Sequence, residues 1–343
     1  MNRHPVRAFT CVLAVALAAA LGIAGCIPIV PEGPVNLASP PGSFVDVHGA
    51  LQVAGGQIRD AHGAPIQLRG MSLFWSQWSG PYYNRRTVHA LAADWHSTVV
   101  RAAMGISNPG GFLNNPFAFE SSRVVVDAAI AEGIYVIIDW HEELAVNHTA
   151  EAAAFFSFVA RRYAATPNVI FEIYNEPNGP QWPAVKAYAE TVIHAIRSAG
   201  ARNLVIVGTP TWSQDADVAA DNPITDDQNI AYTLHFYAGT HHEGLRKRSE
   251  AAMAKGLALF VTEWGTCDSS GNGNLDLVES QKWVDFMDQH GLSWCNFSLN
   301  DKEETASALQ PGTTVGGPPG AADLTPSGSF VYQRLLSAKT SAR

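Results

Sequence analysis

The chain has 343 residues, of which 47% are hydrophobic, 10% aromatic and 15% charged, and its formal net charge is −9. This composition excludes an intrinsically disordered protein, which would be rich in charge and poor in aromatic residues. The length allows one large domain or two ordinary ones, and the acidic balance argues against nucleic acid as a partner, since nucleic-acid-binding proteins usually carry a basic patch.

Residues 1–25 have the composition of an export signal. Two arginines precede an apolar run at residues 10–24, which is shorter than the about 20 apolar residues that a membrane-spanning helix needs. The run ends in Ile-Ala-Gly-Cys, which is similar to the lipobox of bacterial lipoproteins. We therefore expect Cys26 to become the lipidated first residue of an exported protein that is anchored to a membrane. The alternative is an ordinary secretory signal that is cut near residues 18–20.

Residues 26–43 follow as a proline-rich segment, with five prolines between residues 27 and 43. Such a run favours an extended conformation and predicts a tether on the order of 50 Å. Two cysteines remain beyond the tether, Cys267 and Cys295, and their spacing fits no zinc site. After export they could form a disulfide or remain as buried thiols, and the sequence leaves both possibilities open.

Residues 44–343 alternate apolar runs with amphipathic stretches, and this alternation predicts one domain. Residues 51–65 predict an initial β-hairpin. Eight short apolar runs, the predicted strands, follow at 66–72, 98–104, 134–140, 169–174, 203–208, 229–236, 257–264 and 292–299. Helical stretches lie between them, among them 119–131, 150–165, 183–199, 243–255 and 276–290, and the Gly- and Pro-rich residues 311–320 predict a surface loop before a last helix.

Eight β–α units in about 300 residues predict an α/β fold, the TIM (β/α)8 barrel, with an N-terminal β-hairpin. Several of the runs are apolar at consecutive positions, as strands that are buried on both faces are. A doubly wound open sheet is the alternative, but the glycine-rich phosphate loop that would favour it does not follow the first predicted strand.

Polar residues gather at the carboxyl ends of the predicted strands, where the chemistry of a TIM barrel takes place. They are Arg101, Asp139, His141, Asn175, Glu176, His235, Tyr237 and Glu263. Glu176 and Glu263 end the fourth and seventh strands, so their side chains can meet across the mouth of the barrel. Such a pair of carboxylates is what glycoside hydrolysis requires. One glutamate alone would be explained by solvation at a strand end, but two of them among these partners indicate a catalytic pair.

The other polar and aromatic residues have simpler interpretations. We expect Glu172 to form a structural ion pair, Asp139 to bond other site residues, and Glu142 and Glu143 to be surface charges. The adjacent His241 and His242 resemble a metal site only weakly, because no third ligand is evident, and we expect no metal. Five aromatic residues fall at or just after strand ends and predict a rim that stacks on sugar rings: Trp75, Trp78, Trp212, Trp264 and Phe297.

The residues from about 44 to the end resemble glycoside hydrolase family 5, particularly its bacterial endo-β-1,4-glucanase (cellulase) branch. The resemblance rests on the successive segments LRGMSLFWSQW, VVRAAMG, IYVIIDWH, NVIFEIYNEPNG, IVGTPTWSQDAD, YTLHFYAGTHH, FVTEWGT and SLNDKEETASAL. The Asn-Glu-Pro after the fourth predicted strand and the Glu-Trp-Gly on the seventh are its most specific parts.

This resemblance implies a monomeric endo-acting enzyme without a cofactor, which cleaves β-1,4 bonds of cellulose or related β-glucans by a retaining double displacement. It implies that Glu176 is the acid/base and Glu263 the nucleophile. Arg101 beside Glu263 should lower the pKa of that carboxyl, and Tyr237 should hydrogen-bond it. The expected substrate contacts are Asn175 with a 2-hydroxyl, His141 and His235 with the cleaved sugar and Glu176, Trp78 on the glycone side, Trp212 on the aglycone side and Lys302 at a distal sugar.

Three positions depart from the family pattern. Phe297 stands where relatives usually have Trp, Gly105 where they often have an aromatic residue, and Phe74 where they often have His. Phe297 can still stack on a sugar, although its face is smaller. Because these changes lie in the expected cleft, another β-glycan (mannan, xyloglucan, lichenan or xylan) remains an alternative substrate. A non-catalytic glycan-binding lipoprotein is an alternative of a different class.

Overall fold

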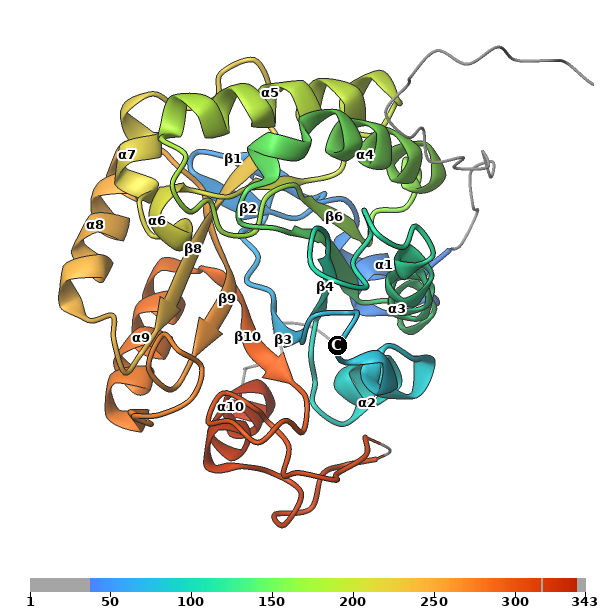
Figure 1. Cartoon of the computed structure of the whole chain (residues 1–343), viewed down its shortest axis with the longest axis vertical. Helices are drawn as coiled ribbons and strands as arrows, with labels where there is room; N and C mark the ends of the chain where they lie inside the picture. Colours follow the sequence, from blue (N-terminus) through green and yellow to red (C-terminus); the bar gives the residue numbers. More distant parts are fainter. Residues whose placement is uncertain (1–37, 316, 338–343) are drawn as a thin grey trace, which may run out of the picture. The chain divides into compact units, whose positions relative to one another are not determined.

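A closed barrel of eight parallel strands forms the centre of the fold, in the order β10-β3-β4-β5-β6-β7-β8-β9 (Figure 1). The computed structural model describes residues 38–315 and 317–337. The barrel strands are β3 (Arg69–Leu73), β4 (Val99–Gly105), β5 (Tyr135–His141), β6 (Val169–Glu172), β7 (Val205–Val207), β8 (Ile230–Tyr237), β9 (Leu259–Gly265) and β10 (Ser293–Leu299). The predicted TIM barrel is therefore confirmed. The predicted export signal and Cys26 lie outside the described residues, as does most of the predicted tether.

Helices follow the strands in turn and surround the barrel (Figure 1). They are α1 (Phe44–His48), α2 (Arg85–Ala93), α3 (Ala118–Glu132), α4 (Thr149–Tyr163), α5 (Trp182–Ser198), α6 (Pro210–Ser213), α7 (Ala216–Asp221), α8 (Glu243–Ala254), α9 (Leu277–His290) and α10 (Pro326–Ser337). The five helical stretches that we named from the sequence match α3, α4, α5, α8 and α9 within two residues at each end. Within the part of the chain that the structure describes, no helix is long and apolar enough to cross a membrane.

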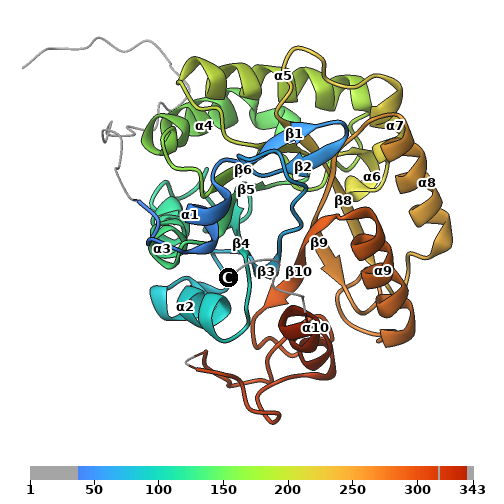
Figure 2. The same cartoon turned by 180° about the vertical axis from the view of Figure 1, so that it is seen from behind.

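The predicted hairpin is also present, as the antiparallel pair β1 (Gln52–Ala54) and β2 (Gln57–Arg59). Its turn consists of Gly55 and Gly56, with φ of 60° and 72°, which is the left-handed conformation that a two-residue hairpin turn requires. Leu51 and Ile58 of this region share one apolar cluster with residues at the beginnings of the barrel strands, such as Val99. The hairpin therefore covers the amino-terminal end of the barrel, and Figure 2 shows it from that side.

The barrel strands are buried on both faces, which explains their long apolar runs. All seven residues of β4, β5, β9 and β10 are buried. The strand register then sets which residues are neighbours: Asp139 of β5 pairs with Glu172 of β6, and His235 of β8 pairs with Glu263 of β9. Charged residues near the carboxyl ends of the strands are thus brought together inside an apolar frame. Cys267 and Cys295 are both buried and both free, so the structure supports the two-thiol alternative.

Gly70 gives a test of how tightly β3 and β4 pack. A Cβ at this position would lie 1.7 Å from the carbonyl oxygen of Val99, so the two strands must separate to admit a methyl group. Gly70→Ala should lower the free energy of unfolding by about 1–3 kcal/mol or more. Gly244→Ala in α8, where nothing lies within 4 Å, is the control and should be neutral or slightly stabilising. Urea denaturation of both variants measures this, and equal stabilities would contradict the packing described.

Candidate active site

A single buried guanidinium organises the site. Arg101 of β4 is fully buried and contacts three carboxylates: Nε lies 2.7 Å from Glu172, Nη2 2.9 Å from Asp139, and Nη1 3.1 Å from Glu263. Its Nη2 also donates to Oδ1 of Asn175 at 2.6 Å. Because a buried charge is tolerated only when it is paired, these contacts fix the four partners relative to one another. The predicted structural ion pair of Glu172 and the predicted bonds of Asp139 are both present.

Glu263 is held by two donors. Its Oε2 accepts from Arg101 at 3.1 Å, and its Oε1 accepts from the hydroxyl of Tyr237 at 2.7 Å. Burial, and then the charge of Glu176, raise the pKa of this carboxyl above its ordinary value, while His235 and Arg101 act in the opposite direction. Our expectation of a lowered pKa was therefore wrong in its net direction, because the loss of solvent outweighs the neighbouring positive charge.

Glu176 lies just after β6 with 17% of its side chain exposed, and its Oε1 is 2.8 Å from Nδ1 of His235. Burial raises the pKa of Glu176 to about 8, and the charge of Glu143 adds to the rise. A carboxylate oxygen of Glu176, one of Glu263 and a ring nitrogen of His235 all lie within 4.8 Å of one another. Two carboxyl groups at such a separation are placed for a covalent, retaining displacement, since an inverting pair leaves room for a water molecule.

Two histidines complete this part of the site. His235 Nε2 lies 2.8 Å from the hydroxyl of Thr262, which in turn donates to Glu172 at 2.7 Å. His141 Nδ1 lies 2.6 Å from Asp139. Burial lowers the pKa of His235 to about 4 and the pKa of His141 to about 3. Both rings are consequently neutral at pH 7, and they act as polar positioning groups rather than as cations.

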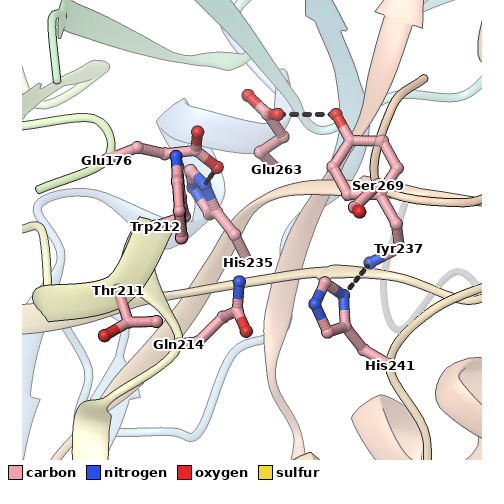
Figure 3. A pocket seen from close by; sticks show the side chains of 9 residues that line it. All are labelled: Glu176, Thr211, Trp212, Gln214, His235, Tyr237, His241, Glu263 and Ser269. Carbon is pink, nitrogen blue, oxygen red and sulfur yellow. Dashed lines mark hydrogen bonds and ion pairs between the residues drawn. The ribbon is translucent and has the colours of Figure 1, made fainter. Parts of the chain in front are cut away.

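A cavity of about 440 Å³ opens beside the two glutamates (Figure 3). Its lining residues are Glu176, Thr211, Trp212, Gln214, His235, Tyr237, His241, Glu263 and Ser269. Five of these nine are residues that the sequence singled out for catalysis or substrate contact: Glu176 from the loop after β6, Trp212 from α6, His235 and Tyr237 from β8, and Glu263 from β9. His241 Nδ1 accepts a hydrogen bond from the backbone N–H of Tyr237 at 2.9 Å, so this nitrogen has a structural partner and is not a free metal ligand.

Trp212 reaches the cavity from an unusual turn. Thr211, Trp212 and Ser213 have φ of 58°, 53° and 57°, the left-handed region that residues other than glycine rarely adopt. Two bonds to the Glu176 loop hold the turn: Trp212 N–H donates to the carbonyl of Pro177 at 3.1 Å, and the Ser213 hydroxyl donates to the carbonyl of Asn175 at 2.7 Å. Such strain persists only where surrounding contacts fix it. Nothing in the sequence analysis indicated this turn.

A second aromatic group includes Trp78, which is 54% exposed and stacks on Trp75 at 5.1 Å. Phe74 lies 6.4 Å from Trp78 and 5.6 Å from Phe297, and Lys302 Nζ is 5.1 Å from the Phe74 ring centre. The ammonium of Lys302 also pairs with Glu304 at 2.5 Å. Ring contacts thus connect Trp78, Phe74 and Phe297, and the Lys302 ammonium lies over the ring of Phe74.

Two residues that belong to the predicted rim are buried. Trp264 is fully buried and stacks on Phe236 of β8 at 5.5 Å, and Phe236 in turn stacks on Trp283 of α9, so the prediction of Trp264 as a rim residue was wrong. Phe297 is 7% exposed and lies parallel to the ring of His141 at 6.3 Å. It therefore contributes to the floor beside the cleft rather than to an open platform.

Glu142 also differs from its prediction as a surface charge. It is 7% exposed, and its carboxylate accepts from the backbone N–H groups of Ser107, Glu143 and Leu144 at 3.1 Å each. The backbone thus provides the hydrogen-bond donors that solvent would have supplied. Through these bonds, Glu142 connects the loop after β4 with the loop after β5. Sequence spacing carries no sign of such backbone contacts.

The described residues offer one group that could hold a metal ion, namely Glu176, His235 and Glu263. Their ligand atoms already have protein partners: both ring nitrogens of His235 are engaged, and both oxygens of Glu263 accept hydrogen bonds. The donor set is explained by acid–base chemistry without a metal, and the expected absence of a metal or cofactor stays a prediction.

A (β/α)8 barrel with two facing glutamates at the carboxyl ends of its strands is the arrangement of a glycoside hydrolase. Comparison with known proteins agrees. Residues 59–303 match the family model described as cellulase, glycosyl hydrolase family 5. The chain therefore belongs to glycosyl hydrolase family 5 and is a hydrolase of the cellulase type.

Individual relatives are similar over most of this chain. An endoglucanase from Clostridium saccharobutylicum is 46% identical over 301 residues, which are 86% of this chain and 67% of the relative. Endoglucanase Z from Dickeya dadantii is 49% identical over 76% of this chain and 62% of its own length. This chain thus spans about two thirds of these relatives. The solved catalytic domain of a Thermobifida fusca endoglucanase has a TM-score of 0.82 and 35% identity, covering 86% of this chain and all of that domain.

The raised pKa of Glu176 predicts a stability cost that depends on pH. Between its ordinary value of 4.5 and about 8, the unfolded chain releases this proton while the folded chain retains it, so folding stability falls as pH rises through that window. Glu176→Gln removes the effect. The free energy of unfolding of the variant relative to that of the parent should therefore rise with pH across this window, by at most about 1.4 kcal/mol per pH unit. Thermal unfolding across this window measures the gain.

The control for this experiment is Glu250→Gln, which replaces a half-exposed carboxylate of α8. It should leave the pH dependence of Tm close to that of the parent protein. If the difference in Tm between Glu176→Gln and the parent is the same at every pH in the window, a raised pKa of Glu176 is contradicted.

Proposed function

We propose that the protein is an endo-β-1,4-glucanase that hydrolyses internal bonds of cellulose or related β-glucans with retention of configuration. The observation that carries the proposal is the separation of the two carboxyl groups, whose nearest oxygens lie within 4.8 Å in one cavity. The relatives described above are endoglucanases, which indicates the substrate class, and a structure of the Thermobifida fusca enzyme in complex with cellotetraose supports it.

In the first step, the carboxylate of Glu263 attacks the anomeric carbon and forms a covalent glycosyl ester, while Glu176 donates its proton to the departing glycosidic oxygen. Arg101 and Tyr237 hold the attacking carboxylate through its two oxygens. In the second step, Glu176, now ionised, takes a proton from water as that water attacks the anomeric carbon and releases Glu263. The raised pKa of Glu176 suits the proton donor of the first step.

The remaining site residues have roles in binding. Oδ1 of Asn175 is occupied by Arg101, so its NH2 group is the part that can donate to the 2-hydroxyl of the cleaved sugar. Trp78 and Trp212 are 54% and 43% exposed, so both offer aromatic faces to a sugar, and we assign Trp78 to the glycone side and Trp212 to the aglycone side. We assign the parallel rings of His141 and Phe297 to the sugar that is cleaved, and Lys302 with Phe74 to a more distant sugar.

Substitution of the two glutamates tests the mechanism. Glu176→Gln and Glu263→Gln should each lower kcat on soluble β-glucan by about 100-fold or more, because the first loses the transferable proton and the second the nucleophile. Proton NMR of the parent reaction should show the β-anomer of the new reducing end first, as retention requires. Initial appearance of the α-anomer, or full activity in either variant with an unchanged fold, would overturn the assignment.

A panel of glucan, mannan, xyloglucan, lichenan and xylan under identical conditions separates the substrate alternatives. Cellulose-type β-1,4-glucan should give the highest kcat/KM. Binding of a glycan without turnover of any panel member would instead support the glycan-binding alternative.

We further propose that the protein is exported and anchored to a membrane through lipidated Cys26, with residues 27–43 as a tether. The proposal rests on the position of Ile-Ala-Gly-Cys at the end of an apolar run in the sequence. Cys26→Ser should move the protein from the membrane fraction of the producing cells to the soluble fraction, with kcat on soluble substrate unchanged. Continued sedimentation of the variant with membranes would contradict the anchor.

A further inference from the structure

A chain of hydrogen bonds leads from Glu176 into the interior of the barrel. Glu176 Oε1 lies 2.8 Å from His235 Nδ1, and His235 Nε2 lies 2.8 Å from the hydroxyl oxygen of Thr262. That hydroxyl donates to Glu172 Oε1 at 2.7 Å. Thr262 is fully buried on β9, directly before Glu263, and does not line the cavity. The proposed mechanism leaves this hydroxyl without a role.

Glu172, at the inner end of this series of hydrogen bonds, fixes the donor and the acceptor in each of them. Glu172 receives Arg101 Nε at 2.7 Å and Nη2 at 3.2 Å, and a carboxylate that forms this fork with a guanidinium accepts only. The one proton of the Thr262 hydroxyl is therefore used toward Glu172. The Thr262 oxygen can then only accept, so the proton of the neutral His235 ring must be on Nε2. Nδ1 is left with a lone pair that faces Glu176.

We propose that Thr262 is a positioning residue that fixes the Nε2–H tautomer of His235, so that Nδ1 accepts a hydrogen bond from the protonated form of Glu176. This inference rests on the proposed acid/base role of Glu176 and extends it. In the first step, the contact retains the proton on Glu176, and this proton leaves its hydrogen bond with His235 Nδ1 for the glycosidic oxygen as the bond to the anomeric carbon breaks. In the second step, the ionised carboxylate faces a lone pair rather than a donor, which makes it a stronger base toward water.

Other charges act on the same proton and must be separated from this contact. Glu176 is also affected by Glu143 from the loop after β5, Arg101 from β4, Asp139 from β5 and Glu172 from β6. Glu263 from β9 and His141 from β5 act on His235, together with Arg101 and Glu172. A substitution at Thr262 removes none of these ionisable groups, but Thr262→Val takes one hydrogen bond from Glu172, which keeps its two bonds to Arg101. The titration of Glu176 in such a variant is therefore read together with the tautomer of His235, which is measured directly.

Thr262→Val retains the shape of the side chain and removes the hydroxyl. The His235 proton is then free to move to Nδ1, where it donates to ionised Glu176 and stabilises it. A hydrogen bond to a charged group contributes about 1.5–3 kcal/mol. The apparent pKa of the alkaline limb in the pH profile of kcat/KM should therefore fall by about 1–2 pH units. Activity on the acid side should change far less. Thr262→Ser restores the hydroxyl and should restore the parental limb.

Thr233→Val is the matched control, because Thr233 is a buried threonine of β8 whose hydroxyl donates to the carbonyl of Val207 at 2.9 Å, while the ring nitrogens of His235 bond Glu176 and Thr262. It should lose stability without a shift of the alkaline limb. An unshifted limb in Thr262→Val, or an equal shift in Thr233→Val, would overturn the proposal.

A second measurement is independent of activity and of the folding of the Thr262 variants. In parent protein with 15N-labelled histidine, the ring of His235, assigned by its loss in His235→Gln, should show the shifts of a neutral Nε2–H imidazole near pH 7. A neutral Nδ1–H ring there would overturn the role of Thr262, even if the enzyme is fully active. Conversely, an Nε2–H ring in a protein that hydrolyses no glycan would support the tautomer and refute the proposed function.

Discussion

The buried ion cluster of Arg101 is the constraint on which the site depends. A guanidinium without solvent requires partners, and this one has Asp139 from β5, Glu172 from β6 and Glu263 from β9. Because the three carboxylates come from three separate strands, the cluster also fixes how those strands meet inside the barrel. Loss of Arg101 would leave three acids close together in a region of low polarity, which is a larger change than the loss of one catalytic contact.

The same cluster makes the two glutamates chemically different, although they share one cavity. Glu263 has a charged donor on one oxygen and a phenol on the other, both of which favour the ionised form. Glu176 has limited access to solvent and the nearby charge of Glu143, both of which favour the protonated form, and the proposed lone pair on His235 Nδ1 acts in the same direction. The proposed division into nucleophile and acid agrees with the groups that surround each carboxyl, even though burial raises the pKa of both.

The sequence could predict the barrel because its strands are buried on both faces and read as apolar runs, and it could predict the site because polar residues interrupt those runs at one end. It could not predict features that depend on contacts between distant backbone segments. Glu142 is buried because three backbone N–H groups surround it, and Trp212 adopts φ of 53° because bonds to Pro177 and Asn175 hold its turn. The net direction of the pKa of Glu263 depends on the balance of burial against Arg101, which spacing alone does not weigh.

The two ends of the barrel interior have opposite compositions, and the active end depends on the other. At the amino-terminal end, the hairpin residues Leu51 and Ile58 pack with Ile137, Ile170 and Phe260 in an apolar cluster whose burial stabilises the fold. At the carboxyl end, the interior holds carboxylates with raised pKa values and histidines with lowered ones, each of which costs stability when buried. The same eight strands run through both ends of the barrel. The apolar cluster at the amino-terminal end therefore keeps these strands in register, and the carboxyl end can hold charged groups. The hairpin is therefore part of what allows catalytic groups to be kept away from water at the opposite end of the barrel.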